Sequence, residues 1–331
     1  MIVDFLKEID VYPEHSKLTT IRSISRSCGG LLCNCAIDLA KLDPDLPVYA
    51  IGITGEDDSG SYVLEKLAAQ PNIDTSRIER RGETAFTDVM FDSTNRTRTF
   101  FTYRGANALL DADCFDFEGF AGSILHIGYI LLLDALDEPD DEYGTVMARV
   151  LAKAKAAGVR TSIDLVSEES DRYGRLVPPA LKYTDYCVIN ETEASKITGL
   201  DIKSASGGLD REKIKKVCGA LKGMGVSEWV IIHSRDASYG LDADGGFYVV
   251  PSVDIPGSMI KGTTGAGDAF ASGALYGAYR GMSIKEAMTV ATAVASCSLL
   301  VPGATEGILP YPEAMAKLDE FKNDFGDVAV D

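Results

Sequence analysis

Short apolar runs with strand-forming residues alternate with amphipathic helical stretches through most of this 331-residue chain. Strands are predicted at residues 48–53, 124–128, 160–164, 186–189 and 228–233. Helices are predicted at residues 31–42, 60–69, 142–157, 192–198, 211–224 and 284–300. Such alternation is typical of a parallel sheet covered by helices on both faces. The sequence therefore predicts an α/β fold with three layers, α/β/α, and a mainly parallel central sheet.

Two regions do not follow this alternation. Residues 17–26 carry isolated isoleucines among Thr, Ser and Arg, and residues 87–92 and 97–103 look like two strands joined by a turn at 93–96. Strands with one polar face predict a small sheet beside the main one. That sheet could be a lid over a site, a dimerisation sheet or an extension of the sheet edge.

The composition excludes several classes of protein. Fifty acidic residues against 32 basic ones give a formal net charge of −18, which repels nucleic acid and anionic membrane surfaces. The apolar run at 124–133 is too short to span a bilayer, and the N-terminus lacks the pattern of a secretory signal. Seven cysteines without framework spacing indicate free thiols. We therefore expect a cytoplasmic protein that binds neither nucleic acid nor membranes.

The strongest chemical signal is a Gly-rich turn, Lys261-Gly-Thr-Thr-Gly-Ala-Gly-Asp268, that runs into an Ala-rich helix. Free backbone N–H groups in a first helical turn bind anions without any charged side chain. The spacing of Gly262 and Gly267 matches the first half of a P-loop, but Asp268 and Ala269 follow where Lys and Ser or Thr are required. A Walker-type site is thereby excluded.

Repulsion between the Asp268 carboxylate and a bound phosphate is electrostatically unfavourable, which suggests that Asp268 has a functional role. One such role is to accept the proton of a hydroxyl that attacks phosphorus. The alternative is that Asp268 only caps the helix and favours its dipole.

Two further groups of residues suggest ligand contacts. Asn190 and Glu193 follow a predicted strand, where open α/β sheets bind ligands, and their oxygens suit Mg²⁺ held through water. An N-terminal helix cap explains the same residues equally well. Near the start, Asp4 and the run from Gly29 to Asn34 could bind the hydroxyls of a polyol, or the two glycines could form a simple turn before a helix.

Taken together, these motifs resemble the ribokinase-like (PfkB) family of carbohydrate kinases over nearly the whole chain. Gly29-Gly30 with Asn34 is similar to the N-terminal sugar motif of that family, and Asn190-x-x-Glu193 to its metal and phosphate motif. The segment from Thr263 to Asp268 looks like its C-terminal signature. Gly105-Ala-Asn107 and Gly303-Ala304 also stand where the family places such residues.

The resemblance implies a single kinase domain over residues 1–331, with a lid formed by about residues 5–28 and 84–106. It implies transfer of the γ-phosphoryl group of ATP to a hydroxyl, commonly a primary one, of a small sugar. Asp268 would be the general base, and the N–H groups of Gly265, Ala266 and Gly267 would form the anion hole. The implied sugar contacts are Asp4, Gly29, Gly30, Asn34, Asn107 and Asp164. The implied nucleotide contacts are Asn190, Thr264, Gly240 and Gly303, with Asn190 and Glu193 ordering Mg²⁺ through water.

The sequence departs from the family pattern at three places. Gly262 replaces an Asp that helps to form a monovalent-cation site, which puts K⁺ activation in doubt; neighbouring Lys261 could supply the charge instead. The segment 234–240 keeps only the last glycine of a nucleotide-side pattern. Only three residues precede Asp4, so either the first central strand is short or the natural chain starts upstream.

Three functions fit this resemblance: a sugar kinase, a nucleoside kinase of the same fold, and a non-catalytic sugar or nucleotide sensor. An intact Asp268 argues against the sensor. Lid strands in this family often pair between subunits, so a homodimer is also expected.

Overall fold

The computed structural model describes residues 1–204 and 207–330, so three residues of the predicted domain lie outside the described part. Its main sheet has six strands in the order β14-β13-β12-β11-β10-β7. The bounds are β7 Ile124–Ile130, β10 Arg160–Leu165, β11 Tyr186–Asn190, β12 Trp229–His233, β13 Ala237–Leu241 and β14 Phe247–Pro251. β7, β10, β11 and β12 are mutually parallel, β13 runs antiparallel to β12, and β14 runs antiparallel to β13. The predicted three-layer, mainly parallel α/β fold is confirmed.

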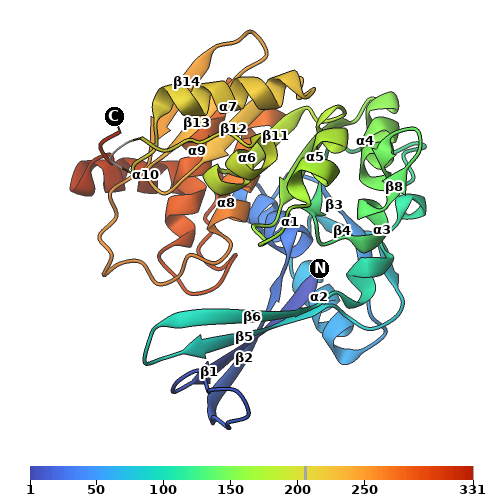
Figure 1. Cartoon of the computed structure of the whole chain (residues 1–331), viewed down its shortest axis with the longest axis vertical. Helices are drawn as coiled ribbons and strands as arrows, with labels where there is room; N and C mark the ends of the chain where they lie inside the picture. Colours follow the sequence, from blue (N-terminus) through green and yellow to red (C-terminus); the bar gives the residue numbers. More distant parts are fainter. Residues whose placement is uncertain (205–206, 331) are drawn as a thin grey trace.

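Helices cover both faces of this sheet (Figure 1). On one face, Val188 and Ile231 pack against α8 (Ala266–Tyr279) and α9 (Ile284–Ser298). On the other face, Cys187 and Ile232 belong to a large core shared with α4 to α7. The bounds of these four are α4 Val146–Ala156, α5 Tyr173–Leu181, α6 Glu191–Thr198 and α7 Arg211–Gly223. Neighbouring strand residues point to opposite faces, and each face is buried, which explains the continuous apolar runs in the sequence.

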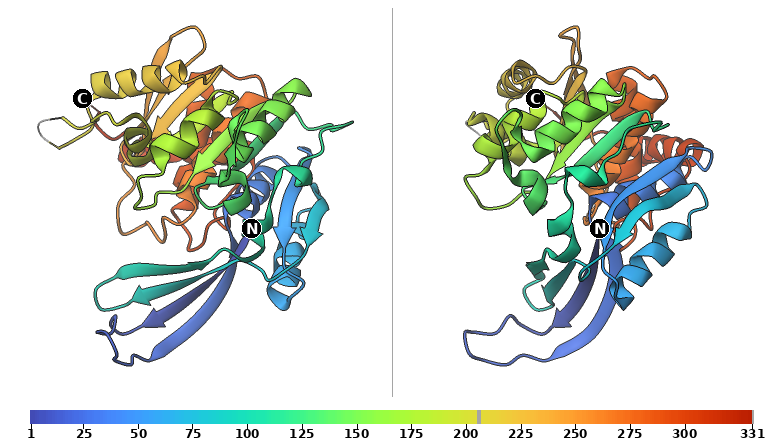
Figure 2. Two further views of the ribbon diagram at one scale, coloured as in Figure 1. Left: turned by 45° about the vertical axis from the view of Figure 1, so that its right-hand side comes forward. Right: turned by 90° about the vertical axis from the view of Figure 1, so that its right-hand side faces the viewer.

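A second sheet of four strands, β2-β1-β5-β6, projects from the body of the molecule (Figure 2). Its strands are β1 Ile2–Ile9, β2 Ile21–Gly29, β5 Phe86–Asp92 and β6 Thr97–Tyr103. We call it the lid sheet. Its β5–β6 hairpin forms where the sequence predicts two strands and a turn. The predicted lid begins at residue 5, whereas the first lid strand begins at Ile2 and therefore contains Asp4.

Other boundaries also differ from the sequence prediction. The helix expected at 142–157 begins only at Val146, because Thr145 caps it through the N–H of Ala148 and Gly144 pairs in a short strand. The sequence analysis does not predict β4 (Ile73–Arg80), β13, β14, α5 or α10 (Tyr311–Phe325). Short connecting elements are η1 Gly105–Leu109, η2 Ala112–Cys114, α3 Asp134–Asp137, β8 Pro139–Asp140 and β9 Gly144–Thr145.

The N-terminal part of the body contains a separate two-stranded parallel sheet, β3 (Val48–Thr54) with β4, flanked by α1 (Leu31–Leu42) and α2 (Asp58–Ala68). A cavity of about 240 Å³ lies between the facing edges of β3 and β7, and α1 and Leu275 also line it. Asp4, Asn34, Asp164 and Asp268 are not among its lining residues. α1 contacts α8 as well as β3 and β7, so it is buried on nearly every side, and its polar residues Asn34 and Asp38 are buried too.

Helix α8 packs against α9 at a very short distance. A Cβ atom on Gly273 would lie 2.6 Å from the Cα of Ala291 and 2.9 Å from its backbone nitrogen. Backbone atoms cannot move aside as a flexible side chain can, so glycine at this position sets the spacing of the two helices. Because Asp268 lies on α8, this contact also fixes the position of that carboxyl group.

We expect Gly273→Ala to lower the free energy of unfolding by about 1–3 kcal/mol, because the methyl group has no space. Gly219 is the matched control: it lies in α7, and a Cβ there would meet nothing within 4 Å. Gly219→Ala should raise the free energy of unfolding by about 0.5–1 kcal/mol through helix propensity. Urea denaturation measures both changes, and a stabilising Gly273→Ala would contradict the close-packing argument.

Candidate active site

The carboxyl ends of the parallel strands meet the first turn of α8. β10 carries Asp164 near its end, β11 ends at Asn190, and β7 carries Tyr129 near its end. α8 begins at Ala266 and places Asp268 in its first turn. Carboxyl ends of neighbouring parallel strands open on the same edge, which is where α/β sheets bind ligands. The topology thus brings together polar residues that are far apart in the sequence.

Asp268 is the centre of this arrangement. Its side chain is buried, with 8% of its surface exposed. Asn34 Nδ2 donates to Asp268 Oδ2 at 2.8 Å, and the Tyr129 hydroxyl lies 2.8 Å from Oδ1 and 3.0 Å from Oδ2. Burial raises the pKa of Asp268 above its usual value, while the Asn34 and Tyr129 donors act in the opposite direction. Both oxygens of the carboxyl group are therefore held in a fixed orientation by neutral donors.

Two other buried carboxyl groups lie in the electrostatic range of Asp268. Burial first, and then the charge of Asp268, hold the pKa of Asp164 well above its usual value. Among the residues that the structure describes, only the backbone N–H of Leu165 donates to this carboxyl group. Asp38 lies one turn after Asn34 on α1, and the same two causes hold its pKa well above the usual value. Neither oxygen of Asp38 has a hydrogen-bond partner among the residues that the structure describes. Of the three carboxyl groups, Asp268 has the most donors to its anionic form.

The turn before α8 has the geometry of an anion site. Gly265 caps the helix with a φ of 77°, a left-handed conformation that favours glycine. The N–H of Ala266 donates to Thr263 O at 3.3 Å, so it is already engaged. Within the described part of the chain, no partner is found for the N–H groups of Gly265 and Gly267. The N–H groups of Gly265 and Gly267 therefore indicate an anion-binding site at the N-terminus of α8, the positive end of its helix dipole.

Asn190 and Glu193 form the helix cap that the sequence analysis left open. The Asn190 side chain accepts from the N–H groups of Thr192 and Glu193, and Glu193 Oε2 accepts from the N–H of Asn190 at 3.1 Å. Ser167 Oγ donates to Glu193 Oε1 at 2.8 Å. Burial raises the pKa of Glu193 to about 7. Both carboxyl oxygens already have donors, which fits contact with Mg²⁺ through water better than direct coordination.

Asp4, another predicted site residue, lies in the lid sheet. Asp4 in β1 pairs with Thr87 in β5, and Gly29 leaves room for its carboxyl group, because a Cβ on Gly29 would lie 2.2 Å from Asp4 Oδ2. Burial raises the pKa of Asp4 to about 6. Gly30 has a φ of 79° and directly precedes α1. Asn34, near the start of α1, binds Asp268. The glycine pair thus joins the lid sheet to the Asp268 site.

The remaining predicted residues are placed as follows. Asn107 lies in η1 and its Oδ1 accepts from the amino group of Met1 at 3.3 Å. Gly303, with a φ of 101°, lies next to Ala304, which packs on Gly265. Gly240 lies in the core strand β13, where a Cβ would lie 2.5 Å from Met288 Sδ, so packing alone accounts for this glycine. The nucleotide contacts of Gly240 and Gly303 stay predictions.

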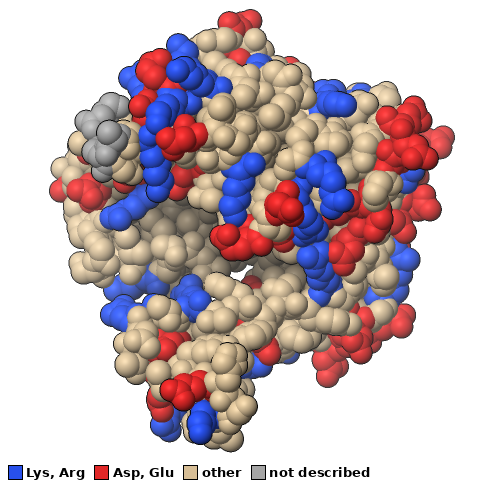
Figure 3. Space-filling view, in the orientation of Figure 1, with Lys and Arg blue, Asp and Glu red and all other residues tan. Residues whose placement is uncertain are grey.

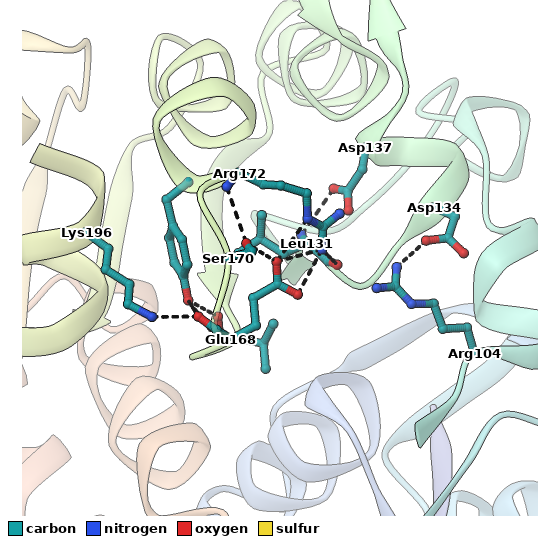
Figure 4. Close-up of polar contacts among 10 residues, drawn as sticks. Arg104, Leu131, Asp134, Asp137, Glu168, Ser170, Arg172 and Lys196 are labelled. Atoms are coloured by element: carbon teal, nitrogen blue, oxygen red, sulfur yellow. Dashed lines mark hydrogen bonds and ion pairs between the residues drawn. The ribbon is translucent and has the colours of Figure 1, made fainter. Parts of the chain in front are cut away.

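Tyr129, whose hydroxyl binds Asp268, was not predicted from the sequence. Figure 4 shows a network of polar contacts around Leu131, close to it in the chain. Leu131, two residues later, has both backbone groups bound: its N–H donates to Asp137 Oδ1, and its carbonyl accepts from Arg172 Nη2 at 2.7 Å. Arg172 also binds Glu168 through two nitrogens. The position of Tyr129 at the end of a strand is the one signal in the sequence that could have indicated it.

The same figure shows how this network reaches the lid sheet. Arg104, directly after β6, forms an ion pair with Asp134 at the start of α3. α3 follows β7, so the base of the lid sheet is tied to the segment that carries Tyr129. Figure 3 shows that the surface is hollowed between the lid sheet and the body of the molecule. The site therefore lies where a ligand can contact the lid sheet and α8 together.

Comparison with known proteins agrees with this geometry. The family model described as pfkB family carbohydrate kinase matches residues 3–311, nearly the whole chain. The chain belongs to the pfkB carbohydrate kinase family. The predicted family membership is thus confirmed, and with it the activity class of a phosphotransferase that uses an alcohol group as acceptor.

Relatives of this pfkB-family kinase include several sugar kinases. Ribokinase of Arabidopsis thaliana is 25% identical over 321 residues, which cover 96% of this chain and 79% of that protein. The 5-dehydro-2-deoxygluconokinase of Shouchella clausii is 27% identical over 313 residues, 90% of this chain and 88% of that protein. The structure of Arabidopsis ribokinase complexed with ribose and ATP has a TM-score of 0.78 at 22% identity, covering 97% and 96% of the two chains.

In residues 1–204 and 207–330, no group of three or more His, Cys, Asp or Glu side chains could hold a metal ion. Over the same ranges, no helix combines the length and the apolar character needed to cross a membrane.

Asp164 offers a test of the electrostatics. Because its pKa is raised in the folded protein, ionising it costs stability, and this cost grows as pH rises from 5 to 8. Asp164→Asn should therefore raise the melting temperature more at pH 8 than at pH 5. In Asp74, on β4, hydrogen bonds from Ser76 lower the pKa, so Asp74→Asn should change stability equally at both pH values. An increase in melting temperature that is the same at both pH values would contradict the raised pKa of Asp164.

Proposed function

We propose that this pfkB-family protein transfers the γ-phosphoryl group of ATP to a primary hydroxyl group of a small sugar, with Asp268 as the general base. Members of the family use ATP, typically with Mg²⁺. The observation that carries the proposal is the combination at the start of α8. A carboxyl group with two fixed donors lies beside a turn in which two backbone N–H groups have no partner among the described residues.

The base assignment follows from the contacts of the three buried carboxyl groups. A general base must be deprotonated to act, and donors to the carboxylate form favour deprotonation. Asp268 has two side-chain donors and the dipole of α8, whereas Asp164 has one backbone donor and Asp38 has none in the described residues. Asp268 is therefore the group that ionises first. Its burial keeps the pKa above the usual value, which increases its strength as a base.

The chemistry then needs few further groups. The acceptor oxygen forms a bond to the γ-phosphorus, its proton passes to Asp268, and the bond between the γ-phosphorus and the bridging oxygen breaks, leaving its electron pair on ADP. The N–H groups of Gly265 and Gly267 would stabilise the charge that develops on the transferred group. Asn190 and Glu193 would hold waters of Mg²⁺, an ion that neutralises phosphate charge.

The acceptor site is proposed on the lid side of Asp268. Asp4 lies in the lid sheet beside Gly29, Gly30 directly precedes α1, and Asn34 on α1 binds Asp268. Asn34 Oδ1 is buried and has no hydrogen-bond partner among the described residues. A sugar hydroxyl could donate to that oxygen and to the carboxyl group of Asp4. Closure of the lid sheet over the acceptor would exclude water, which otherwise competes as an acceptor.

Replacing the base tests this proposal directly. Asp268→Asn should lower kcat by at least about 10²–10⁴-fold, because the amide keeps the size of the side chain but cannot take the proton. Nucleotide binding and melting temperature should change little. Asp319→Asn on the exposed face of α10 is the control and should leave kcat unchanged. The assay couples ADP release to a dye and runs against ketoses, aldoses, sugar acids and nucleosides, with and without K⁺.

That assay also decides among the alternatives. Turnover of nucleosides alone would replace sugar as the acceptor, and no turnover with any acceptor would favour a binding protein. Asp268→Asn with full turnover would overturn the base assignment. We further propose that K⁺ is not required, since Gly262 replaces the family's Asp; Lys261 is exposed, and its Nζ donates to Ser258 O at 3.1 Å. Loss of turnover without K⁺ would contradict this.

We also propose a homodimer formed through the outer face of the lid sheet. Ile24, Phe101 and Tyr103 are 63%, 49% and 43% exposed, and the strand register places them all on the face opposite Asp4. An exposed apolar patch of this kind is typical of a protein–protein interface. We assign it to a second copy of the same chain, because that contact requires no other protein.

The oligomer is checked by size-exclusion chromatography with light scattering. The wild-type chain should be a dimer, and Phe101→Ser should shift it to the monomer. Phe100→Ser is the matched control, because Phe100 is 62% exposed on the other face of the same strand and should leave the dimer intact. A monomeric wild-type protein would contradict this proposal.

A further inference from the structure

Arg98 lies at the tip of the β5–β6 hairpin, as the second residue of β6. Its Nη1 donates to Thr264 Oγ1 at 2.9 Å, so the lid sheet contacts the turn before α8. Thr264 directly precedes Gly265, whose N–H belongs to the proposed anion hole. The contact therefore places a permanently charged guanidinium group one residue from the site where a phosphoryl group would bind.

The strand register shows that Arg98 shares a face of the lid sheet with the acceptor side of the site. Thr102 pairs with Thr87, and Thr87 pairs with Asp4, so these three residues lie on one face. Arg98 is four residues before Thr102 on the same strand and therefore lies on that face too. It pairs with Phe91, and its guanidinium carbon lies 6.0 Å from the centre of the Phe91 ring. Arg98 and Asp4 thus both face the body of the molecule.

The charges of the site create a need for a cation. Asp268, Asp164 and Glu193 are three buried carboxyl groups, and no Lys or Arg side chain in the described residues forms an ion pair or hydrogen bond with any of them. A bound triphosphate adds more negative charge beside these carboxyl groups. The two free N–H groups of the turn carry only partial charges. A positive group must therefore come from a metal ion, from the lid sheet, or from both.

We propose that Arg98 is a catalytic residue, which donates hydrogen bonds to the oxygens of the phosphoryl group while that group passes from ATP to the acceptor. This rests on the proposed function. Arg98 keeps its proton throughout; its planar N–H groups match phosphoryl oxygens. It exchanges Thr264 for the phosphoryl group as partner when the site fills.

Kinetics of two variants test the proposal. Arg98→Gln should lower kcat by about 10²–10³-fold, the loss expected when one donor to a developing charge is removed. The KM values for ATP and acceptor should change less than about threefold, because the contact strengthens mainly in the transition state. Arg98→Lys should recover only part of kcat. Arg96→Gln, in the turn of the same hairpin, is the control and should match the wild type.

A purely structural contact gives a different pattern. If Arg98 only holds the lid sheet against Thr264, Arg98→Gln will raise KM and leave kcat near the wild-type value, which would overturn the proposal. Addition of guanidinium ion to Arg98→Ala should restore part of kcat, because it replaces the missing charge; guanidinium restores nothing if the side chain acts as a tether.

The failure of this proposal is distinct from failure of the proposed function. If Asp268→Asn loses turnover while Arg98→Gln keeps the wild-type kcat, the kinase assignment stands and the role of Arg98 is wrong. If the wild-type protein shows no ATP-dependent turnover with any acceptor, the proposed function itself is wrong.

Discussion

The buried carboxyl group of Asp268 is the constraint on which the rest of the site depends. Asp268 lies in the first turn of α8, so the close packing of α8 against α9 at Gly273 fixes the position of the Asp268 carboxyl group. Asn34 from α1 and Tyr129 from β7 hold its two oxygens. A carboxyl group removed from water and bound by neutral donors is a stronger base than one in solvent, and it can still be ionised. The anion-binding site and the acceptor site that we propose both depend on the position of this one group.

The acidic surface of the protein is consistent with this arrangement. A net charge of −18 repels polyanions at long range, but salt screens such charges beyond about 10 Å. In our proposal, a phosphate group is bound instead by backbone N–H groups, by Mg²⁺ and by Arg98. Within the site, the neighbouring acids Asp38 and Asp164 have pKa values held well above their usual range. Both are therefore protonated more readily than an exposed carboxyl group, which reduces the repulsion that Asp268 meets.

Local patterns in the sequence predicted the four parallel strands of the main sheet, the β5–β6 hairpin and a Gly-rich turn that runs into an Ala-rich helix, but not the antiparallel strands β13 and β14. Asp268, Asn34 and Glu193 could be predicted because each belongs to a short motif. Tyr129 and Arg98 could not, because their partners lie 139 and 166 residues away in the chain, and only the fold brings them together. Asp38 was hidden for another reason: α1 is buried on nearly every side, so its amphipathic pattern does not show which polar residue faces α8. Gly240 fits a nucleotide motif in part, but packing against Met288 explains it equally well.

The central claim is that the acceptor hydroxyl attacks the phosphorus directly while Asp268 takes its proton, so that Asp268 never carries the phosphoryl group. The stereochemical course at phosphorus tests this most directly, with ATP made chiral at the γ position by sulfur and an oxygen isotope. A single in-line transfer predicts inversion of configuration in the phosphorylated product. Retention of configuration would indicate two successive transfers through an enzyme-bound phosphoryl group, and would contradict the role assigned to Asp268.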